Sequence, residues 1–242
     1  MEKIENWFYE DLEQTSSTND AVLDFLAKIK APCILSARTQ TNGRGRLGRK
    51  WEGASGNLYV SFAYPIDISK IGHYVLLSGL AVLETLKVFL SKNLVQVKWP
   101  NDVFVEGKKI SGILFEKGPQ DYWVMGIGIN ISKVPTLLNP MYQITSLADF
   151  GVTTDRTKVL KILVKQFDFL KTQYEKYGYS YIKSLWLDNA YNRGKKVTIK
   201  QHDRKIEGVL FDLDANGGLI LKTHDGEKHM IAGDLFIREK ND

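Results

Sequence analysis

The chain has 242 residues, of which 43% are hydrophobic and 25% are charged, and its formal net charge is +5. This length and composition allow one or two domains with a substantial hydrophobic core, and the charge balance does not by itself indicate a nucleic-acid-binding protein. The single cysteine, Cys33, excludes an intramolecular disulfide and a cysteine-based zinc cluster. The apolar residues around Cys33 predict a buried small side chain rather than a reactive thiol.

Two stretches bear on the cellular compartment. Residues 1–14 are acidic and lack the apolar core of a signal peptide, so we expect a cytoplasmic protein. Residues 71–90 are mostly apolar but include His73, Glu84 and Lys87. Because charged side chains are costly inside a bilayer, this stretch predicts a buried helix rather than a membrane span.

The first elements in chain order are a helix and two strands. Ser17 or Thr18 can accept a backbone N–H at the start of the helix, and Asp20 would lie in its positive first turn. Residues 33–40 predict a strand, and the alternation of apolar residues after Gly56 predicts another.

The middle of the chain predicts two long helices separated by strands. The first helix covers about residues 71–91. Strands over residues 103–105 and 110–116 form a hairpin, in which Gly107 can take a positive φ. The second helix has strong amphipathic spacing and ends at Gly178, a typical C-cap residue.

The pattern changes near residues 189–195, where short strands and turns replace the longer elements. We therefore expect two domains, a larger one over residues 1–190 and a β-barrel of SH3-like size over residues 195–242. The larger domain mixes helices with strand hairpins. Its predicted fold class is α+β, with a mixed or antiparallel sheet and flanking helices.

The segment TNGRGRLGRKWEG, residues 41–53, concentrates positive charge on a glycine-rich backbone. Arginine offers planar charged donors, and glycine lets backbone N–H groups turn toward an anion, so a phosphate or a carboxylate is the expected ligand. A solvated surface loop and an RNA-contacting segment are the alternatives that these residues leave open. We call residues 43–51 the arginine loop.

Other nucleotide and metal motifs are incomplete. The arginine loop lacks the Gly-Lys-Ser/Thr ending of a P-loop, and GIGINI at residues 126–131 lacks the third glycine of a dinucleotide fingerprint. The sequence has no nucleophile elbow and no His-Glu-x-x-His, and its four histidines show no metal-ligand spacing. These observations argue against the corresponding hydrolases and metalloenzymes.

Five motifs occur in order, namely SSTN at 16–19, TQTNGRGRLGRKW at 39–51, VKWPND at 97–102, GKKISGILFE at 107–116 and GIGIN at 126–130. Together they resemble the biotin protein ligases, or biotin–[acetyl-CoA-carboxylase] ligases. The resemblance covers about residues 10–150 in detail, and the C-terminal hairpins fit the small barrel of this family by position and size. It implies the class II synthetase-like fold of biotin/lipoate ligases, with the catalytic domain in residues 1–190.

The reaction implied by the resemblance uses biotin and ATP as substrates and Mg²⁺ as cofactor. The biotin carboxylate attacks the α-phosphate to give biotinoyl-5′-AMP, and a lysine of a biotin carboxyl carrier protein then displaces AMP. Both steps gather negative charge near one phosphorus atom, so the site must supply positioned cations and exclude water. A glycine-hinged arginine loop that closes as a lid can do both.

On the biotin side, the resemblance implies contacts from the start of the first helix and from the arginine loop. Arg44, Arg46 and Lys109 are the expected catalytic cations. For the residues that begin the helix, simple capping is the alternative role. The full set expected at biotin is Ser17, Thr18, Asn19, Gln40, Gly43, Arg44, Gly45, Arg46, Lys109 and Gly112.

On the nucleotide side, the resemblance places Trp51 near adenine, with a plain core aromatic as the alternative. Asp102 is the expected Mg²⁺ ligand, because this ion prefers oxygen ligands and keeps several waters. Asn101 faces the nucleotide or forms a structural turn. The full set expected at ATP is Arg46, Arg49, Trp51, Lys98, Asn101, Asp102, Lys109 and Asn130.

The SSTN motif begins at residue 16, which leaves too little chain before it for the helix-turn-helix domain that some family members carry. The resemblance therefore implies a monofunctional ligase with no DNA partner and no membrane partner. Both a monomer and a homodimer fit the sequence. Two other functions stay open: a lipoate–protein ligase, whose loop motif is an arginine followed by glycines, and a non-catalytic biotin-binding module.

Overall fold

The computed structural model describes residues 2–53, 55–132, 134, 142–201, 204–231 and 233–237. Its α-helices are α1 (Thr18–Ile29), α2 (Ile71–Leu86), α3 (Arg156–Tyr177) and α4 (Tyr179–Asp188). Its strands are β1 (Glu2–Ile4), β2 (Trp7–Thr15), β3 (Cys33–Gln40), β4 (Leu58–Pro65), β5 (Val95–Lys98), β6 (Asp102–Val105), β7 (Lys108–Lys117), β8 (Tyr122–Ile129), β9 (Lys196–Gln201), β10 (Arg204–Leu213), β11 (Leu219–Thr223), β12 (Gly226–Met230) and β13 (Asp234–Ile237).

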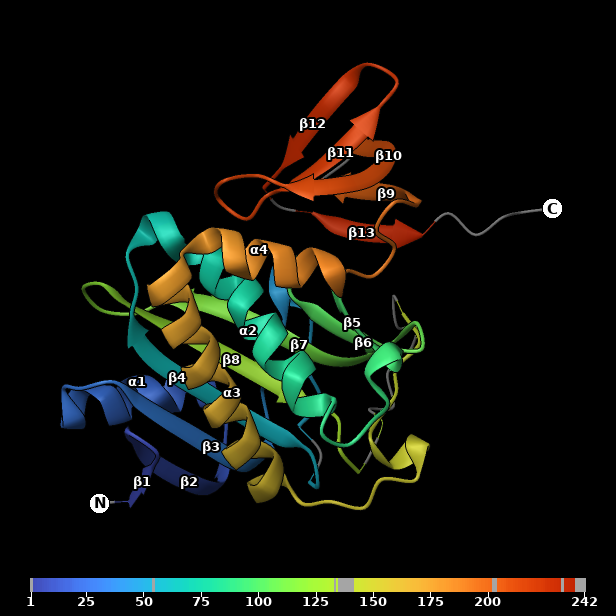
Figure 1. Ribbon diagram of the computed structural model, residues 1–242. Helices are drawn as coiled ribbons and strands as arrows, with labels where there is room; N and C mark the ends of the chain where they lie inside the picture. Colours follow the sequence, from blue (N-terminus) through green and yellow to red (C-terminus); the bar gives the residue numbers. More distant parts are fainter. Residues whose placement is uncertain are drawn as a thin grey trace.

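These strands form two sheets. The larger has the order β1-β2-β3-β4-β8-β7-β6-β5, and the smaller has the order β12-β11-β10-β9-β13. In the larger sheet β2 and β3 run parallel because α1 crosses over between them, whereas the other neighbouring strands pair antiparallel. The predicted α+β class with a mixed sheet is confirmed. Figure 1 shows the smaller sheet at one end of the larger domain.

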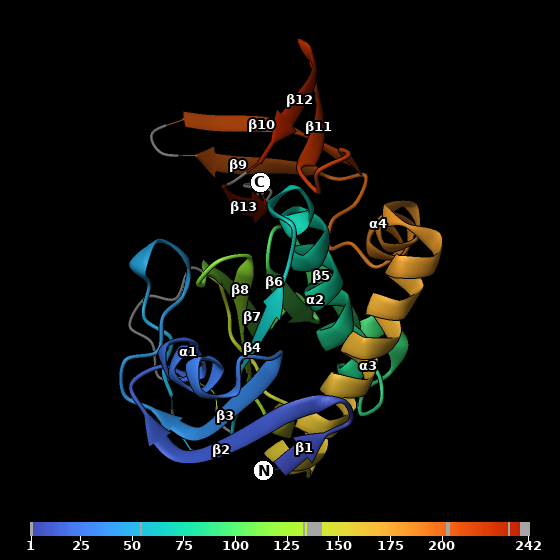
Figure 2. The ribbon, with the colours of Figure 1, turned by 90° about the vertical axis from the view of Figure 1, so that its left-hand side faces the viewer.

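The larger sheet carries helices on both faces (Figure 2). Side chains of a strand alternate between faces, so Cys33 and Leu35 of β3 pack with Val22 and Phe25 of α1, while Ile34 joins the core under the other helices. That second core contains most of the buried residues of α2, including the stretch that the sequence identified as a buried helix. Within the described ranges, no helix is long and apolar enough to cross a membrane.

Helix α2 is shorter than expected. It ends at Leu86 rather than near residue 91, and the chain then turns so that the N–H groups of Phe89 and Leu90 both donate to the Leu86 carbonyl. Leu90 is nevertheless buried. The apolar pattern therefore continues past the end of the helix, which explains why periodicity alone placed the boundary too late.

Three elements were not expected from the sequence. Strands β1 and β2 arise from the acidic N-terminal stretch, where Trp7 and Tyr9 are buried on one face of β2. Helix α4 follows α3 immediately, since Gly178 has a φ of 73° and ends α3 as predicted. Its signal was the spacing of Ile182 and Trp186, which both face the core.

The hairpin between β6 and β7 is confirmed. Its two-residue turn consists of Glu106 and Gly107, with φ values of 50° and 76°. Positive φ at both positions is the geometry that matches the right-handed twist of the flanking strands. This turn sets the register in which Asp102 and Lys109 lie on adjacent strands.

The smaller sheet begins after the connector 189–195, where the sequence placed the domain boundary. All its strand pairs are antiparallel, and β12 and β13 remain its edges within the described residues. The turn between β10 and β11 packs against the larger domain, where Trp99 Nε1 donates to the Gly217 carbonyl at 3.3 Å. Near it, His73 Nε2 lies 2.7 Å from the Ala215 carbonyl oxygen.

Candidate active site

One pocket on the α1 face of the larger sheet collects nearly all the residues expected at the site. It encloses about 1210 Å³ of space, open solvent included. Gly43 is the one expected residue that does not line it. The expected residues that line it are Ser17, Thr18, Asn19, Gln40, Arg44, Gly45, Arg46, Arg49, Trp51, Lys98, Asn101, Asp102, Lys109, Gly112 and Asn130.

The floor of the pocket is flat because glycines occupy the pocket-facing positions of two strands. Gly126 and Gly128 alternate along β8 on the same face as Val124, which packs with α1. A Cβ at Gly128 would lie 2.5 Å from Trp51 Cε2, and one at Gly112 of β7 would lie 3.0 Å from Trp51 Cζ3. The glycines therefore let the indole ring lie against the sheet. This packing accounts for the glycines of the GIGIN motif, so no dinucleotide-binding role is needed to explain them.

The start of α1 forms one buried end of the pocket. Ser17, Thr18 and Asn19 are each only 4% exposed. The expected capping by the Ser17 or Thr18 side chain is wrong, because Ser17 makes no side-chain cap hydrogen bond and the Thr18 hydroxyl donates to Gln40 Oε1 at 3.1 Å. Instead, Gln40 Oε1 accepts from the Thr18 backbone N–H at 2.8 Å. Gln40 thus caps the helix from β3, and Ser17 lines the pocket without a capping role.

Ser61 of β4 is a site residue that the sequence did not reveal. It is fully buried behind the start of α1. Its Oγ makes hydrogen bonds with Thr18 Oγ1 at 2.8 Å and with Asn19 Oδ1 at 2.6 Å. Only the pairing of strands brings Ser61 to this place, and no motif marks it.

The arginine loop is internally ordered rather than simply solvated. The Gly45 N–H donates to the Arg49 carbonyl at 2.6 Å, and the Trp51 N–H donates to the Gly43 carbonyl at 2.9 Å. A Cβ at Gly43 would lie 2.5 Å from the Trp51 carbonyl oxygen. Gly43 is therefore needed where the two arms of the loop meet, outside the pocket lining. Leu47 at the tip is 81% exposed and has a φ of 57°.

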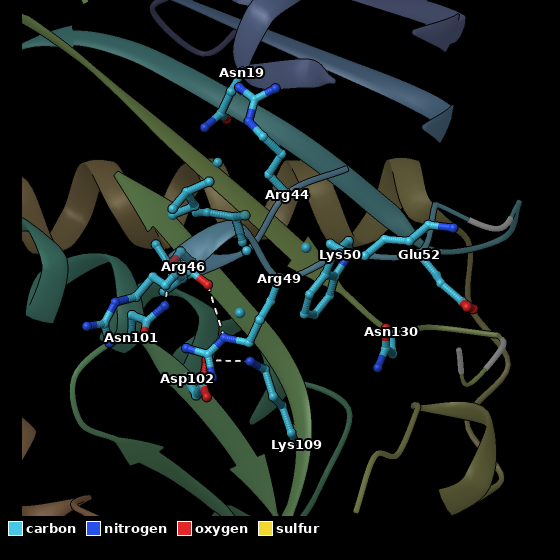
Figure 3. Close-up of a pocket in the computed structure, with 18 of the residues that line it drawn as sticks. Asn19, Arg44, Arg46, Arg49, Lys50, Glu52, Asn101, Asp102, Lys109 and Asn130 are labelled. Carbon is cyan, nitrogen blue, oxygen red and sulfur yellow. Dashed lines mark hydrogen bonds and ion pairs between the residues drawn. The ribbon is translucent and has the colours of Figure 1, made fainter. Parts of the chain in front are cut away.

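Arg44 points toward α1 (Figure 3). Its guanidinium donates two hydrogen bonds to the Asp20 carboxylate, both at 2.7 Å, and a further one to Glu116 Oε2 at 3.1 Å. The hydrogen bonds from Arg44 lower the pKa of Asp20, and the Asp20 carboxylate raises the pKa of Arg44. The sequence suggested neither carboxylate as a partner of Arg44, because only the folding of α1 and β7 brings Asp20 and Glu116 close to it.

Arg46 points away from Arg44, toward Asn101 (Figure 3). Its Nη1 donates to Asn101 Oδ1 at 3.2 Å and to the Gly233 carbonyl at 3.3 Å. Arg49 Nε in turn donates to the Arg46 carbonyl at 3.0 Å. The two expected catalytic arginines thus lie at different ends of the pocket, and Arg46 contacts the residue that precedes β13 of the smaller sheet.

Lys109 and Asp102 form an ion pair on the adjacent strands β7 and β6. Lys109 Nζ lies 2.7 Å from Asp102 Oδ1, and it lies 5.4 Å from the ring of Trp51. The positive charge of Lys109 is therefore held between a carboxylate and an aromatic face on the pocket floor. Figure 3 shows both side chains pointing toward each other.

Lys98 is only 3% exposed, which is unusual for a lysine side chain. Its Nζ donates to Tyr142 Oη at 3.0 Å and lies 4.1 Å from the centre of that ring. Tyr142 Oη then donates to the Leu235 carbonyl of β13 at 3.0 Å. Tyr142 and Leu235 both line the pocket. The sequence missed them because they come from a loop and from the separate C-terminal sheet.

Three buried polar atoms in the pocket have no hydrogen-bond partner among the described residues, and one of them, Asp102 Oδ1, has Lys109 as its ion-pair partner. The other two have neither kind of partner. They are the Oδ1 atom of Asn130 and the Nε1 atom of Trp51, and both are buried. The other amide atom of Asn130, Nδ2, donates to the Thr145 carbonyl at 3.0 Å. Because buried polar atoms are usually paired, one acceptor and one donor are available to a bound ligand.

The side chains present fit a Mg²⁺ ion that is held mainly by a substrate. Within the described ranges, no three His, Cys, Asp or Glu side chains are grouped closely enough to form a protein-only metal site. Asp102 offers a single buried carboxylate at the centre of the pocket. Mg²⁺ commonly binds one or two carboxylates together with waters and substrate phosphates, which is the arrangement that this donor set allows.

Known proteins share both parts of this architecture. The profile of the Biotin/lipoate A/B protein ligase family matches residues 12–130, and that of the Biotin protein ligase C terminal domain matches residues 194–238. The Bifunctional ligase/repressor BirA of Escherichia coli (strain K12) is 32% identical over 92% of this chain and 71% of its own length. The Biotin--[acetyl-CoA-carboxylase] ligase of Paracoccus denitrificans is 28% identical over 93% of this chain and 99% of its own length.

Solved structures agree. The biotin protein ligase from Aquifex aeolicus in complex with biotin and ATP superposes with a TM-score of 0.84 at 30% identity, covering 94% of this chain and 97% of that protein. The match extends over both sheets, so the resemblance is not confined to the short motifs. The chain therefore belongs to the biotin protein ligase family.

Proposed function

We propose that this chain joins biotin to ATP to form biotinoyl-5′-AMP and then transfers biotin to a lysine of a carrier protein. Two findings on relatives support the proposal. The Aquifex aeolicus structure was solved with biotin and ATP, and the Paracoccus denitrificans relative is named for biotin and acetyl-CoA carboxylase.

One observation carries the proposal. A single pocket joins a buried polar end at Ser17 and Thr18, a cationic loop, and the Lys109–Asp102 pair. The polar end suits an uncharged ureido head, and the cations suit a carboxylate that meets a polyphosphate. A simple binding module would need the first feature but not the last two.

In the first step, a biotin carboxylate oxygen attacks the α-phosphorus of ATP. A new O–P bond forms, the bond to the pyrophosphate oxygen breaks, and pyrophosphate leaves with that electron pair. We assign Lys109 and Arg46 to the oxygens around this phosphorus, because the reacting groups are all negative and positioned cations offset their repulsion. Arg44 is expected at the carboxylate, at the other end of the loop.

At rest, Asp102 acts as the counter-ion of Lys109, at a distance of 2.7 Å. Phosphates that enter the pocket offer Lys109 a second anion, and its flexible ammonium can follow the phosphate as it moves. Mg²⁺, when bound beside Asp102, supplies charge neutralisation for the phosphates. Asp102 is the residue that would hold the ion, through its carboxylate.

We assign the nucleotide to the part of the pocket near Trp51, Lys98 and Asn130. The free acceptor of Asn130 and the free donor of Trp51 can bond to ribose or base atoms. Lys98 is tethered to Tyr142, so it holds a fixed positive charge near the phosphates. Asn101 and Arg49 keep Arg46 in place through the contacts described above.

In the second step, the amine of a carrier lysine attacks the carbonyl carbon of the mixed anhydride. An amide bond forms, the C–O bond to AMP breaks, and the attacking nitrogen loses its proton to solvent. The arginine loop lies across the pocket and limits access of water until the carrier arrives. Its internal hydrogen bonds allow it to move as a unit.

The carrier that we expect is a biotin carboxyl carrier protein of acetyl-CoA carboxylase or of a related biotin enzyme. The relative from Escherichia coli is named as a repressor as well as a ligase. Absence of DNA binding by this chain, its oligomeric state and a cytoplasmic location stay predictions.

The test is biotin-dependent exchange of labelled pyrophosphate into ATP, followed by mass measurement of a carrier domain incubated with ATP, Mg²⁺ and the chain. We expect exchange with biotin and a carrier mass increased by biotin minus water. Exchange with lipoate but not biotin would identify a lipoate ligase instead. Biotin binding without exchange would identify a non-catalytic module.

A further inference from the structure

We propose that Glu116 is a positioning residue that couples the biotin-head end of the pocket to the arginine loop. It does so by sharing its carboxylate between Asn19 and Arg44. Glu116 comes from β7, Asn19 from α1 and Arg44 from the loop. The inference rests on the proposed function in one respect only, which is that biotin occupies the end of the pocket formed by the start of α1.

The first half of the connection is a buried chain of polar groups. Thr18 Oγ1 contacts Ser61 Oγ at 2.8 Å, and Ser61 Oγ contacts Asn19 Oδ1 at 2.6 Å. Ser61 is fully buried, and the other two side chains are only 4% exposed. Hydrogen bonds in such a dry environment hold their geometry more firmly than those in water.

The second half crosses to the arginine loop through one carboxylate. Asn19 Nδ2 donates to Glu116 Oε2 at 2.6 Å, and Arg44 Nη2 donates to the same oxygen at 3.1 Å. A displacement of Asn19 must therefore move Glu116, and a displacement of Glu116 must move the guanidinium. Asp20 accepts hydrogen bonds from both Nη1 and Nη2 of that guanidinium, so Nη2 of Arg44 is shared between the two carboxylates.

Gly126 leaves Asn19 no room to relax. A Cβ at Gly126 would lie 2.2 Å from Asn19 Oδ1 and 2.9 Å from its Cγ. The amide is thus confined between the backbone of β8 and Ser61. It uses its oxygen toward Ser61 and its nitrogen toward Glu116. Asn19 therefore acts as a rigid connector, and a ligand seated on Thr18 restrains the loop through it.

The coupling has a consequence for the order of events. Binding of the biotin head at Thr18 and Asn19 restrains Glu116 and Arg44 before any nucleotide is present. The loop then presents Arg44 to the carboxylate at the tail of biotin. Loss of Glu116 separates the two ends, so biotin binding no longer stabilises the arginine loop.

A double-mutant cycle tests the coupling. Asn19→Ala and Arg44→Gln are made singly and together in the full chain, and the biotin Kd is measured by calorimetry without ATP. If Glu116 couples the two side chains, the change in Kd of the double variant differs by about fivefold from the product of the changes in the single variants. In a Glu116→Ala background, which lacks the shared acceptor oxygen, the same cycle becomes additive. The proposal is overturned if, with Glu116 present, the change in Kd of the double variant equals the product of the two single changes to within twofold.

A substrate-free measurement separates the coupling from the assignment of biotin. Amide hydrogen exchange is followed at Gly45 and Trp51, whose N–H groups close the loop. We expect Glu116→Ala and Asn19→Ala to speed exchange several-fold, even without ligand. Unchanged exchange in both variants overturns the coupling, whereas wild-type protein that exchanges as expected but does not bind biotin overturns the proposed function.

A matched control uses an exposed pair of the same chemistry. Glu13 contacts Arg38 at 3.1 Å on the sheet, and neither residue lines the pocket. Glu13→Ala removes the same carboxylate as Glu116→Ala. We expect it to leave both the cycle and the exchange of Gly45 unchanged, and an equal effect of the two variants overturns a specific role for Glu116.

Discussion

Lys109 Nζ lies 2.7 Å from Asp102 Oδ1, across the antiparallel strands β7 and β6. The side chains of the two residues are 22% and 10% exposed, respectively, so water screens the pair only weakly. The resting pocket therefore contains its own counter-ion for the cation that we assign to the phosphate. Substrate binding has to exchange this internal partner for an external one, and this exchange makes Lys109 the most direct test of the site.

Lys109→Ala is expected to lower the rate of biotin-dependent pyrophosphate exchange by about 100-fold or more, which is the usual effect of removing one group that stabilises a transition state. The variant leaves Asp102 without its ion pair, so we also expect a modest loss of thermal stability. Exchange of labelled pyrophosphate and the unfolding midpoint measure the two effects separately. Lys108→Ala is the control, since Lys108 is exposed on the same strand and does not line the pocket.

Arg46→Gly is expected to weaken retention of biotinoyl-5′-AMP, because it removes the contacts of the loop with Asn101 and Gly233. The measurement is the fraction of adenylate that stays with the protein after rapid gel filtration. Leu47→Gly is the control, since it adds a glycine next to Arg46 where the φ of 57° already suits one. Equal retention by wild type and Arg46→Gly would show that Arg46 does not hold the lid.

Gly72→Ala is expected to loosen the C-terminal sheet. A Cβ at Gly72 would lie 1.8 Å from the Asn216 carbonyl oxygen, a clash that α2 or the β10–β11 turn must relieve by moving. We expect a loss of roughly 1–3 kcal/mol in unfolding free energy and a higher KM for ATP, since Leu235 of that sheet lines the pocket. Denaturant unfolding and exchange kinetics measure these effects.

The control for this prediction is Gly79→Ala on the same helix. A Cβ there would meet only Val97 Cγ1, at an ordinary 3.7 Å. Alanine also has the higher helix propensity, so we expect unchanged or slightly increased stability. If Gly79→Ala destabilised the protein as much as Gly72→Ala, a general sensitivity of α2 and not the domain contact would be responsible.

Burial raises the pKa of the Cys33 thiol to about 12, while an unfolded cysteine titrates near ~8.5. The native thiol is also inaccessible to solvent. We expect no alkylation by iodoacetamide at pH 8 until denaturant unfolds the chain, as measured by mass. Rapid labelling of the folded protein would contradict this burial.

The same shift predicts how stability depends on pH. The folded state keeps the Cys33 thiol protonated up to about pH 12, whereas the unfolded chain loses this proton above about pH 8.5. The stabilising contribution is thus complete below that pH and declines as the pH rises further. Cys33→Ala should flatten the fall of unfolding free energy between pH 9 and pH 10.5, compared with wild type in denaturant titrations.

The sequence predicted the pocket lining well because the expected residues lie in short motifs whose order is readable along the chain. It failed where the partner is set by strand pairing. Ser61 and Glu116 reach Asn19 only because β4, β8 and β7 are neighbours in the larger sheet. A single sequence contains no signal for that register, since many serines and glutamates occupy similar positions on strands.

The fold class was predicted correctly, but the number of its elements was not. The helices with strong apolar spacing were found, and the end of α3 at Gly178 was placed correctly. Strands β1 and β2 were missed because acidic residues mask the alternation of Trp7 and Tyr9. The contribution of Tyr142 was missed for another reason, since the position of a loop residue depends on Lys98 and Leu235, which are far apart in the sequence.

Leu235 belongs to β13, the last of the described strands, and Gly233 directly precedes that strand. Leu235 lines the pocket, and the Gly233 carbonyl accepts a hydrogen bond from Arg46 of the arginine loop. During synthesis on the ribosome, the first 190 residues emerge well before these groups. A nascent chain can fold its larger sheet at that stage, but its pocket still lacks the lining residue that the smaller sheet supplies. Newly made protein should therefore acquire activity only after β13 has left the ribosome and packed against the larger domain.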